Sequence, residues 1–310
     1  MSEALVRKKV LLDFEKLRAK GILTPDTGRS VVAEEYRVIK RPLLLKASQS
    51  DNNKDRPKKL MMVTSAFPKE GKTFTAINLA MSLAAEMDST VLLVDGDVAK
   101  PSVSRILGFK SKIGLIDCLM GKVSDYTEAV IRTNVPKLMI LPSGRRHHHA
   151  TELLASDSMR ILLKKMMQDP NRIIVFDSPP LLLTTESREL ARAMGQIVVV
   201  IEAERTPQNA VKDALGQLED LEIVGLVLNK TRRRGRGGYY YYGYGGYGGY
   251  GGYGGYGGYG GYGGYGGYGG YGGYGGYGGY GGYGGYGGQD GKKRGRKRRK
   301  KGLIKRLLGM

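Results

Sequence analysis

The sequence has little of what a disulfide scaffold, a cysteine-rich metal site or a membrane span needs. One cysteine, Cys118, is present among 310 residues, and tryptophan is absent. A single thiol excludes a disulfide framework and fits a reducing compartment. No apolar run approaches the ~20 residues that cross a bilayer, and the N-terminus lacks the apolar stretch and cleavage site of a signal peptide. These absences predict a cytoplasmic protein.

Tyrosine and charge are distributed unevenly along the chain. Of the 21 tyrosines, 19 lie in residues 239–286, and a nearly perfect Gly-Gly-Tyr repeat covers residues 243–288. Residues 1–229 hold 34 basic and 28 acidic side chains, whereas residues 230–310 hold 16 basic side chains and one acidic one. The net charge of +21 therefore divides into +6 for the first segment and +15 for the second. The sequence joins a mildly basic globular part to a strongly basic low-complexity tail.

Short, continuously apolar segments predict the sheet of the globular part. They cover residues 60–63, 91–94, 138–141, 173–176, 197–201 and 224–228. Strands that are apolar on both faces and alternate with helical segments are typical of a sheet covered by helices on both sides. The prediction is therefore an α/β fold with a doubly wound, mostly parallel sheet.

The segment before this sheet has helical patterns. Apolar spacing predicts an amphipathic helix over residues 4–20 and a second helix over residues 31–45. Pro42 is expected to kink or end the second helix, and residues 48–59 read as a polar linker. A further helix is expected over residues 72–87, directly after the first strand and a turn.

The turn before that helix carries a phosphate-binding pattern. Gly71-Lys72-Thr73 supplies backbone N–H groups at a helix N-terminus, a lysine for the terminal phosphates and a hydroxyl for Mg²⁺. The first glycine of the usual pattern is missing, because Ala66 stands there. Taken alone, the pattern would be a weak signal.

Two carboxylate motifs strengthen the prediction of a phosphate-binding site. The strand 91–94 runs into Asp95-Gly96-Asp97, and the strand 173–176 runs into Asp177. Ligands of doubly wound sheets bind beyond the carboxyl ends of the strands, so these carboxylates are expected beside the phosphates, where they can hold Mg²⁺. The alternative is that the aspartates only cap turns, which would require several independent coincidences.

These motifs together resemble those of the bacterial tyrosine kinase family, P-loop autokinases related to the MinD/ParA ATPases. The matching residues are Ser65-x-x-Pro68-x-x-Gly71-Lys72-Thr73, Asp95-x-Asp97 and Asp177-Ser178-Pro179-Pro180. The MinD/ParA branch places a signature lysine where this chain has Phe67. More narrowly, residues 23–25, 33–44 and 150–156 resemble the soluble autokinases of exosortase-associated exopolysaccharide loci.

The resemblance implies a set of roles in ATP- and Mg²⁺-dependent phosphoryl transfer. Lys72 would contact the β- and γ-phosphates and Asp95 would act as base or orienter for a tyrosine hydroxyl. The expected metal ligands, direct or through water, are Thr73, Asp95, Asp97 and Asp177, and the expected catalytic residues are Lys72, Asp95, Asp97 and Asp177. The expected nucleotide-binding residues are Ser65, Pro68, Lys69, Glu70, Gly71, Lys72, Thr73 and Asn229, the last where relatives read the base.

The resemblance also implies self-assembly and a phosphate acceptor. Glu34-x-x-Arg37-x-x-Lys40 matches the family's self-assembly motif, with lysine in place of the final arginine, which weakens bidentate pairing. An ordinary solvated helix face is the alternative. The family's C-terminal tyrosine cluster is its autophosphorylation target, which here predicts the acceptors Tyr239, Tyr240, Tyr241, Tyr242, Tyr244 and Tyr247.

The tail itself is expected to be a disordered chain, since glycine-rich repeats cannot form a packed core. It could instead be a spacer that is little phosphorylated. Residues 292–301 are almost entirely basic and lead into an amphipathic end at residues 303–308. That combination favours peripheral contact with the anionic inner face of the plasma membrane. Nucleic-acid binding is the competing interpretation.

The prediction is a protein-tyrosine autokinase that phosphorylates its own tail and regulates exopolysaccharide biosynthesis or export. It would assemble as a homo-oligomer and respond to a membrane-bound polysaccharide chain-length regulator. The rivals are a MinD/ParA-like positioning ATPase and a nucleic-acid-binding or condensate-forming protein driven by the tail. The expected parts are an N-terminal helical segment and linker at 1–57, a kinase core at 58–236, a tyrosine tail at 237–288 and a polybasic end at 289–310.

Overall fold

The computed structural model describes residues 8–49, 56–219, 221 and 224–231. All of these lie in the first of two units, residues 1–239 and 240–310. The predicted tyrosine tail and polybasic end lie outside the described residues.

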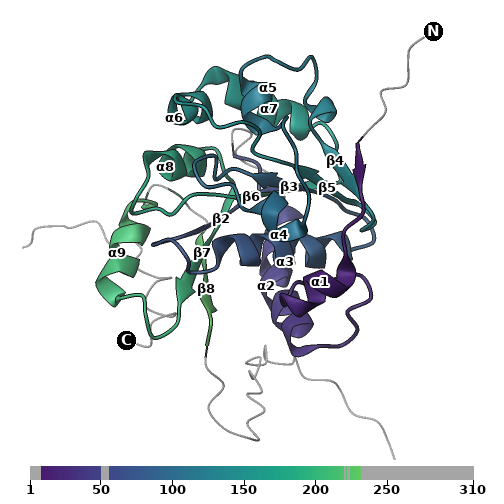
Figure 1. Cartoon of the computed structure of the whole chain (residues 1–310). Helices are drawn as coiled ribbons and strands as arrows, with labels where there is room; N and C mark the ends of the chain where they lie inside the picture. Colours follow the sequence, from purple (N-terminus) through teal and green to yellow (C-terminus); the bar gives the residue numbers. More distant parts are fainter. Residues whose placement is uncertain (1–7, 50–55, 220, 222–223, 232–310) are drawn as a thin grey trace, which may run out of the picture. The chain divides into compact units, whose positions relative to one another are not determined.

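Eight strands of the described part form one sheet in the order β1-β4-β5-β3-β6-β2-β7-β8 (Figure 1). The pair β4–β5 is antiparallel, and the other neighbours are parallel. The strands are β1 Lys9–Val10, β2 Leu60–Ser65, β3 Thr90–Asp95, β4 Ile131–Thr133, β5 Leu138–Leu141, β6 Arg172–Asp177, β7 Gln196–Glu202 and β8 Val224–Asn229. All six predicted strands are confirmed, as is the α/β class with a mostly parallel sheet.

Helices cover both faces of the sheet (Figure 1). On one face lie α1 Phe14–Ala19, α2 Val31–Ala47, α3 Lys72–Ala84 and α4 Val103–Leu107. On the other lie α5 Leu115–Leu119, α6 Ala150–Leu154, α7 Asp157–Met166, α8 Thr185–Arg192 and α9 Gln208–Gly216. A short 3₁₀ turn covers Tyr126–Glu128.

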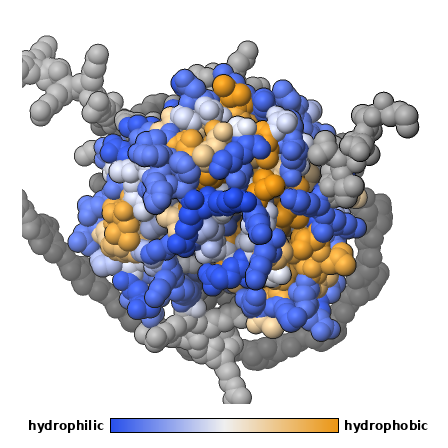
Figure 2. Space-filling model, turned by 45° about the horizontal axis from the view of Figure 1, so that its top comes forward, coloured by the Kyte–Doolittle hydropathy of each residue, from blue (hydrophilic) through white to orange (hydrophobic). Residues whose placement is uncertain are grey.

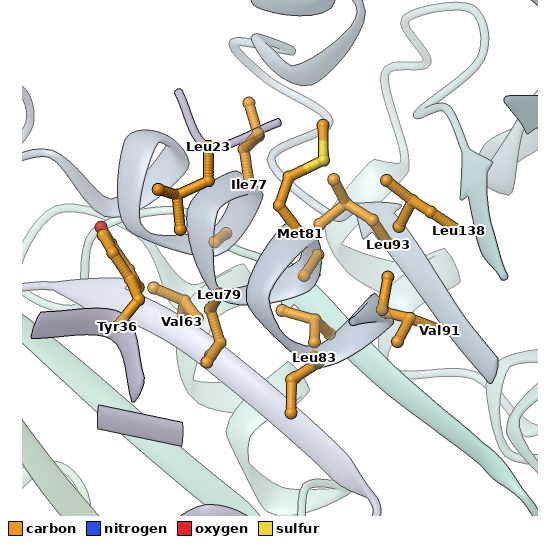
Figure 3. Close-up of a cluster of buried hydrophobic side chains, with 14 of the residues drawn as sticks. Leu23, Tyr36, Val63, Ile77, Leu79, Met81, Leu83, Val91, Leu93 and Leu138 are labelled. Carbon is orange, nitrogen blue, oxygen red and sulfur yellow. The ribbon is translucent and has the colours of Figure 1, made fainter. Parts of the chain in front are cut away.

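The strands supply both hydrophobic cores. Along β2, Met61 and Val63 pack under α2 and α3, whereas Leu60 and Met62 pack on the opposite side, because successive side chains of a strand point to opposite faces. Figure 3 shows part of the first core, in which Tyr36 of α2 lies among the aliphatic side chains of α3 and the sheet. This double burial explains why the strands read as continuous apolar runs.

The predicted helix over residues 4–20 is wrong for its described first part. Lys9 and Val10 instead form the edge strand β1, in parallel register with Arg132 and Thr133 of β4. The Asn134 side chain then holds the backbone N–H and carbonyl of Leu12, at 2.9 and 3.1 Å. The helix α1 begins only after these long-range contacts, which local periodicity cannot reveal.

Pro42 does not end the second helix, which was one of the two outcomes expected of it. The helix α2 continues for five residues beyond it, to Ala47. Leu43 and Ala47 are buried in the first core, and Gln196 of β7 donates to the Leu43 carbonyl at 3.0 Å. Tertiary packing therefore outweighs the backbone hydrogen bond that proline removes.

The described surface is mixed in polarity. In the face shown in Figure 2, hydrophilic residues cover the centre and hydrophobic residues form smaller patches around them. Among the described helices, none is long and apolar enough to cross a membrane.

Candidate active site

The three motifs singled out in the sequence meet at the carboxyl edge of the sheet. The strands β3, β6 and β2 are neighbours, and Asp95 and Asp177 stand opposite each other in the β3–β6 register. The Gly96 N–H donates to the Asp177 carbonyl at 2.7 Å. The phosphate loop, residues 66–71, follows the adjacent strand β2 and leads into α3. The predicted convergence is present in the structure.

The phosphate loop is shaped by glycine in one position and by hydrogen bonds in others. Gly71 has a φ of 104°, and a Cβ added there would lie 2.0 Å from the Asn229 amide nitrogen. Lys69 also adopts a positive φ, of 70°. Ala66 stands where the usual pattern has its first glycine, and it is not among the described residues with positive φ. Alanine can therefore adopt the backbone conformation of the loop at this position.

A buried glutamate folds the tip of the loop. The Phe67 N–H donates to the Glu70 carboxylate at 2.8 Å, and the Ser65 hydroxyl donates to the Phe67 carbonyl at 2.7 Å. Pro68 lies between these contacts in the chain. Ser65 therefore hydrogen-bonds to the backbone of the loop. The first N–H groups of α3 have no helical partners, and the loop that leads into the helix sets their orientation.

Lys72 is buried between carboxylates. Its Nζ donates to Asp97 Oδ2 at 2.6 Å and lies 4.0 Å from Asp177 Oδ1. Burial lowers the pKa of Lys72, but the charges of Asp177 and Asp97 outweigh it, so the pKa is raised. Lys72 is therefore held in the site as a cation.

Two of the aspartates are strongly perturbed. Burial, reinforced by the charge of Asp177, raises the pKa of Asp95 to about 8. Burial raises the pKa of Asp177 to about 6, against the opposing charge of Lys72. Two buried carboxylates beside one lysine cannot both ionise easily. Perturbed groups that lie close together in this way are typical of functional sites.

The donor set fits a divalent cation held together with phosphate. Both carboxylate oxygens of Asp177 and Oδ1 of Asp95 are buried without a hydrogen-bond partner. Thr73 also lowers the pKa of Asp177, although no hydrogen bond of ordinary geometry joins the two. Within the described residues no three His, Cys, Asp or Glu side chains form a ready cluster for a metal. A cation here would need phosphate oxygens to complete its shell.

The remaining carboxylate oxygens are occupied. Asp95 Oδ2 accepts the N–H groups of Ser102 and Val103, both at 3.1 Å. Asp97 Oδ1 accepts the Lys100 N–H at 3.0 Å. These bonds fix the single loop between β3 and α4 and leave Oδ1 of Asp95 without a hydrogen-bond partner.

Asn229 lies against the phosphate loop. Its amide donates to the Glu70 carbonyl at 2.8 Å. Beside it, the Lys230 Nζ donates to the Lys69 carbonyl at 2.7 Å, and the Thr206 hydroxyl donates to the Glu70 carboxylate. Sequence reasoning missed Thr206 completely, and nothing in its local sequence could have marked it.

The predicted self-assembly residues behave differently from one another. Arg37 pairs with Glu34 on the exposed side of α2. Lys40, in contrast, donates to the Ser82 carbonyl at 2.8 Å and pairs with Glu86, beyond the end of α3. Arg37 and Lys40 border a pocket of ≈ 370 Å³. Lys40 is therefore engaged within its own chain.

The predicted phosphate acceptors lie outside the described residues. They are Tyr239, Tyr240, Tyr241, Tyr242, Tyr244 and Tyr247. The two described tyrosines are both engaged. Tyr36 is 5% exposed, and burial raises its pKa to about 12, and Tyr126, partly buried, accepts a hydrogen bond of 2.6 Å from Arg172.

Comparisons with known proteins agree with this geometry. A family model described as AAA domain matches residues 69–223. Tyrosine-protein kinase YwqD of Bacillus subtilis is 30% identical over 226 residues, which cover 71% of this chain and 91% of that protein. The succinoglycan biosynthesis transport protein ExoP of Rhizobium meliloti is 31% identical over 222 residues, 69% of this chain but 27% of that protein.

A solved structure extends the agreement to the fold. The VpsO kinase domain superposes with a TM-score of 0.55 at 30% identity, covering 64% of this chain and 96% of that domain. The narrower resemblance to exosortase-associated autokinases stays a prediction. With a P-loop, a lysine and three aspartates in the arrangement just described, this chain belongs to the bacterial tyrosine-protein kinase family.

Proposed function

We propose that this chain is an ATP- and Mg²⁺-dependent autokinase that phosphorylates tyrosines of its own C-terminal tail and thereby regulates exopolysaccharide biosynthesis or export. The observation that carries the proposal is the buried cluster of Lys72, Asp95, Asp97 and Asp177 at the N-terminus of α3. Positioning and charge neutralisation are the main requirements of phosphoryl transfer, and this cluster can supply both.

Each residue of the cluster has a place in the transfer. Loop N–H groups and Lys72 bind the β- and γ-phosphates of ATP. The tyrosine oxygen forms a bond to the γ-phosphorus while the bond from that phosphorus to the β–γ bridging oxygen breaks, so ADP leaves. The tyrosine proton passes to Asp95, which accepts it only as a carboxylate. Positive charge in the site favours that form.

The residues present fit a magnesium ion. Thr73 and Asp177 would hold it, with Asp95 and Asp97 contributing directly or through water. When bound, Mg²⁺ supplies neutralisation of the phosphate charges. Lys72 would then leave Asp97 for the phosphates, which frees an oxygen of Asp97.

The choice of tail tyrosines follows by elimination. Phosphorylation of Tyr36 would require α2 to leave α3, because its side chain lies within the core between them (Figure 3). Tyr126 is held by Arg172. The other 19 tyrosines all lie in residues 239–286. The tyrosines of this segment are therefore the proposed acceptors.

We propose a homo-oligomer in which Glu34 and Arg37 take part, and a membrane-bound polysaccharide chain-length regulator as activator. ExoP supports the second point. That protein is a succinoglycan biosynthesis transport protein, and the part matched by this chain is 27% of its length, so a kinase-like segment there shares a polypeptide with other sequence. The basic C-terminus would hold the chain at the anionic inner face of the plasma membrane.

The test is ATP-dependent tyrosine phosphorylation by the purified full chain. Wild type, Lys72→Ala and the exposed-lysine control Lys164→Ala are incubated with Mg-ATP, with and without the regulator's cytoplasmic segment. Phosphotyrosine and released phosphate are both measured. We expect phosphotyrosine in wild type and Lys164→Ala and none in Lys72→Ala. Phosphate release without phosphotyrosine under both conditions would favour a MinD/ParA-like ATPase.

A further inference from the structure

Three residues that are distant in the chain donate hydrogen bonds to the phosphate loop. We call them the loop brace; they are Thr206, Asn229 and Lys230. Thr206 donates to the Glu70 carboxylate, and Asn229 donates to the Glu70 carbonyl at 2.8 Å. Lys230 donates to the Lys69 carbonyl at 2.7 Å. The brace therefore contacts both residues that precede Gly71.

This part of the loop needs support. Lys69 and Gly71 both have positive φ, of 70° and 104°, a region of backbone conformation that is strained for a non-glycine residue such as Lys69. Glu70, between them, is 3% exposed. Its buried carboxylate is satisfied by the Phe67 N–H and the Thr206 hydroxyl. Without these partners an unpaired charge would remain beside the phosphate site.

The brace is itself fixed to the sheet edge. The Thr206 hydroxyl accepts the Glu202 N–H at 3.1 Å while it donates to Glu70. Lys230 also pairs with Glu202 at 2.9 Å, and the Ala203 N–H donates to the Asn229 carbonyl at 2.9 Å. The ends of β7 and β8 thus form one hydrogen-bonded unit behind the loop.

From this arrangement we infer that Thr206 and Asn229 are positioning residues for phosphoryl transfer. They hold the loop N–H groups where the phosphates bind, so their effect is independent of the nucleotide base. A base-reading role for Asn229 predicts the opposite, because its loss would then change the preference between adenine and guanine. The inference rests on the proposed kinase function, but nucleotide binding tests it separately.

The experiment measures binding of Mg-ATP and Mg-GTP by calorimetry and phosphotyrosine formation for the full chain. Thr206→Val and Asn229→Ala are compared with Thr133→Val and Asn134→Ala, which remove side-chain hydrogen bonds at the far side of the sheet. Thr206→Ser tests rescue. Thermal unfolding establishes that each variant is folded, and Asn229→Asp, similar in volume without the amide donor, replaces an unfolded Asn229→Ala.

We expect Thr206→Val and Asn229→Ala to weaken both nucleotides by the same factor, about tenfold to a hundredfold. The controls and Thr206→Ser should stay within about threefold of wild type. If Thr206→Val and Asn229→Ala weaken nucleotide binding but wild type itself forms no phosphotyrosine, the positioning role of the brace is supported and the kinase function is refuted. Unchanged binding in Thr206→Val, or a loss confined to ATP in Asn229→Ala, would overturn the inference.

Discussion

Asp95→Asn should stabilise the nucleotide-free protein while it abolishes phosphoryl transfer. Burial and the charge of Asp177 raise the pKa of Asp95 from 3.8 to about 8 in the folded chain. A group with a raised folded-state pKa contributes stability that is complete below its unfolded pKa and is lost as the pH rises through its folded pKa. Asp95 therefore weakens the folded state progressively between pH 4 and pH 8.

The magnitude follows from the two pKa values. At pH 7 the unfolded side chain is ionised, because the pH is about three units above its pKa, whereas the folded side chain still holds its proton. At about 1.4 kcal/mol per unit, the loss of stability is at most about 4 kcal/mol. Asparagine keeps an acceptor for Ser102 and Val103 and carries no charge for Asp177 to repel, so much of this loss should be recovered.

The assay is urea unfolding of wild type, Asp95→Asn and Asp97→Asn from pH 5 to pH 8 without nucleotide. The stability advantage of Asp95→Asn should grow with pH by up to about 1.4 kcal/mol per unit. Asp97→Asn should instead destabilise, because it removes the negative charge 2.6 Å from the buried Lys72 ammonium. An advantage of Asp95→Asn that is zero or independent of pH would show that burial does not keep Asp95 protonated in the folded chain.

Three further predictions use other parts of the chain. Gly71→Ala should lose nucleotide binding and more stability than Gly108→Ala, because both positions have positive φ but only Gly71 faces a clash, with Asn229; equal unfolding free energies would contradict this. Arg37→Ala should lower the oligomer mass measured by light scattering, whereas Lys40→Ala should chiefly lower the unfolding temperature; the reverse pattern would place assembly on Lys40. Each phosphotyrosine adds about −1.5 to −2 charges, so roughly eight to ten of them cancel the tail's +15. Phosphorylation should therefore release the chain from anionic vesicles. A vesicle pull-down, with RNA binding measured in parallel at the same salt concentration, checks this.

The sheet and the residues gathered at its carboxyl edge could be predicted from local sequence. The strands β2, β3 and β6 are buried on both faces, so each stands out as a continuous apolar run. The topology of such sheets then brings the residues after those strands to one edge. Lys72, Asp95 and Asp177 were therefore identifiable before any coordinate was known.

The contacts that tune the site could not be predicted in the same way. Thr206 and Glu70 are 136 positions apart in the chain, and Asn229 and Glu70 are 159 apart. Such pairs depend on the final packing of β7 and β8 against the loop. The same reason applies to the edge strand β1, whose two residues gain their extended conformation from β4.

The proposal that this chain phosphorylates its own tail can be decided by locating phosphate along the chain. The full chain is incubated with Mg-ATP and the modified residues are located by mass spectrometry, with Lys72→Ala as control. We expect phosphotyrosine within residues 239–286, none at Tyr36 or Tyr126, and none anywhere in Lys72→Ala. An unmodified tail in a protein that hydrolyses ATP, or phosphate confined to Tyr36 or Tyr126, would contradict it.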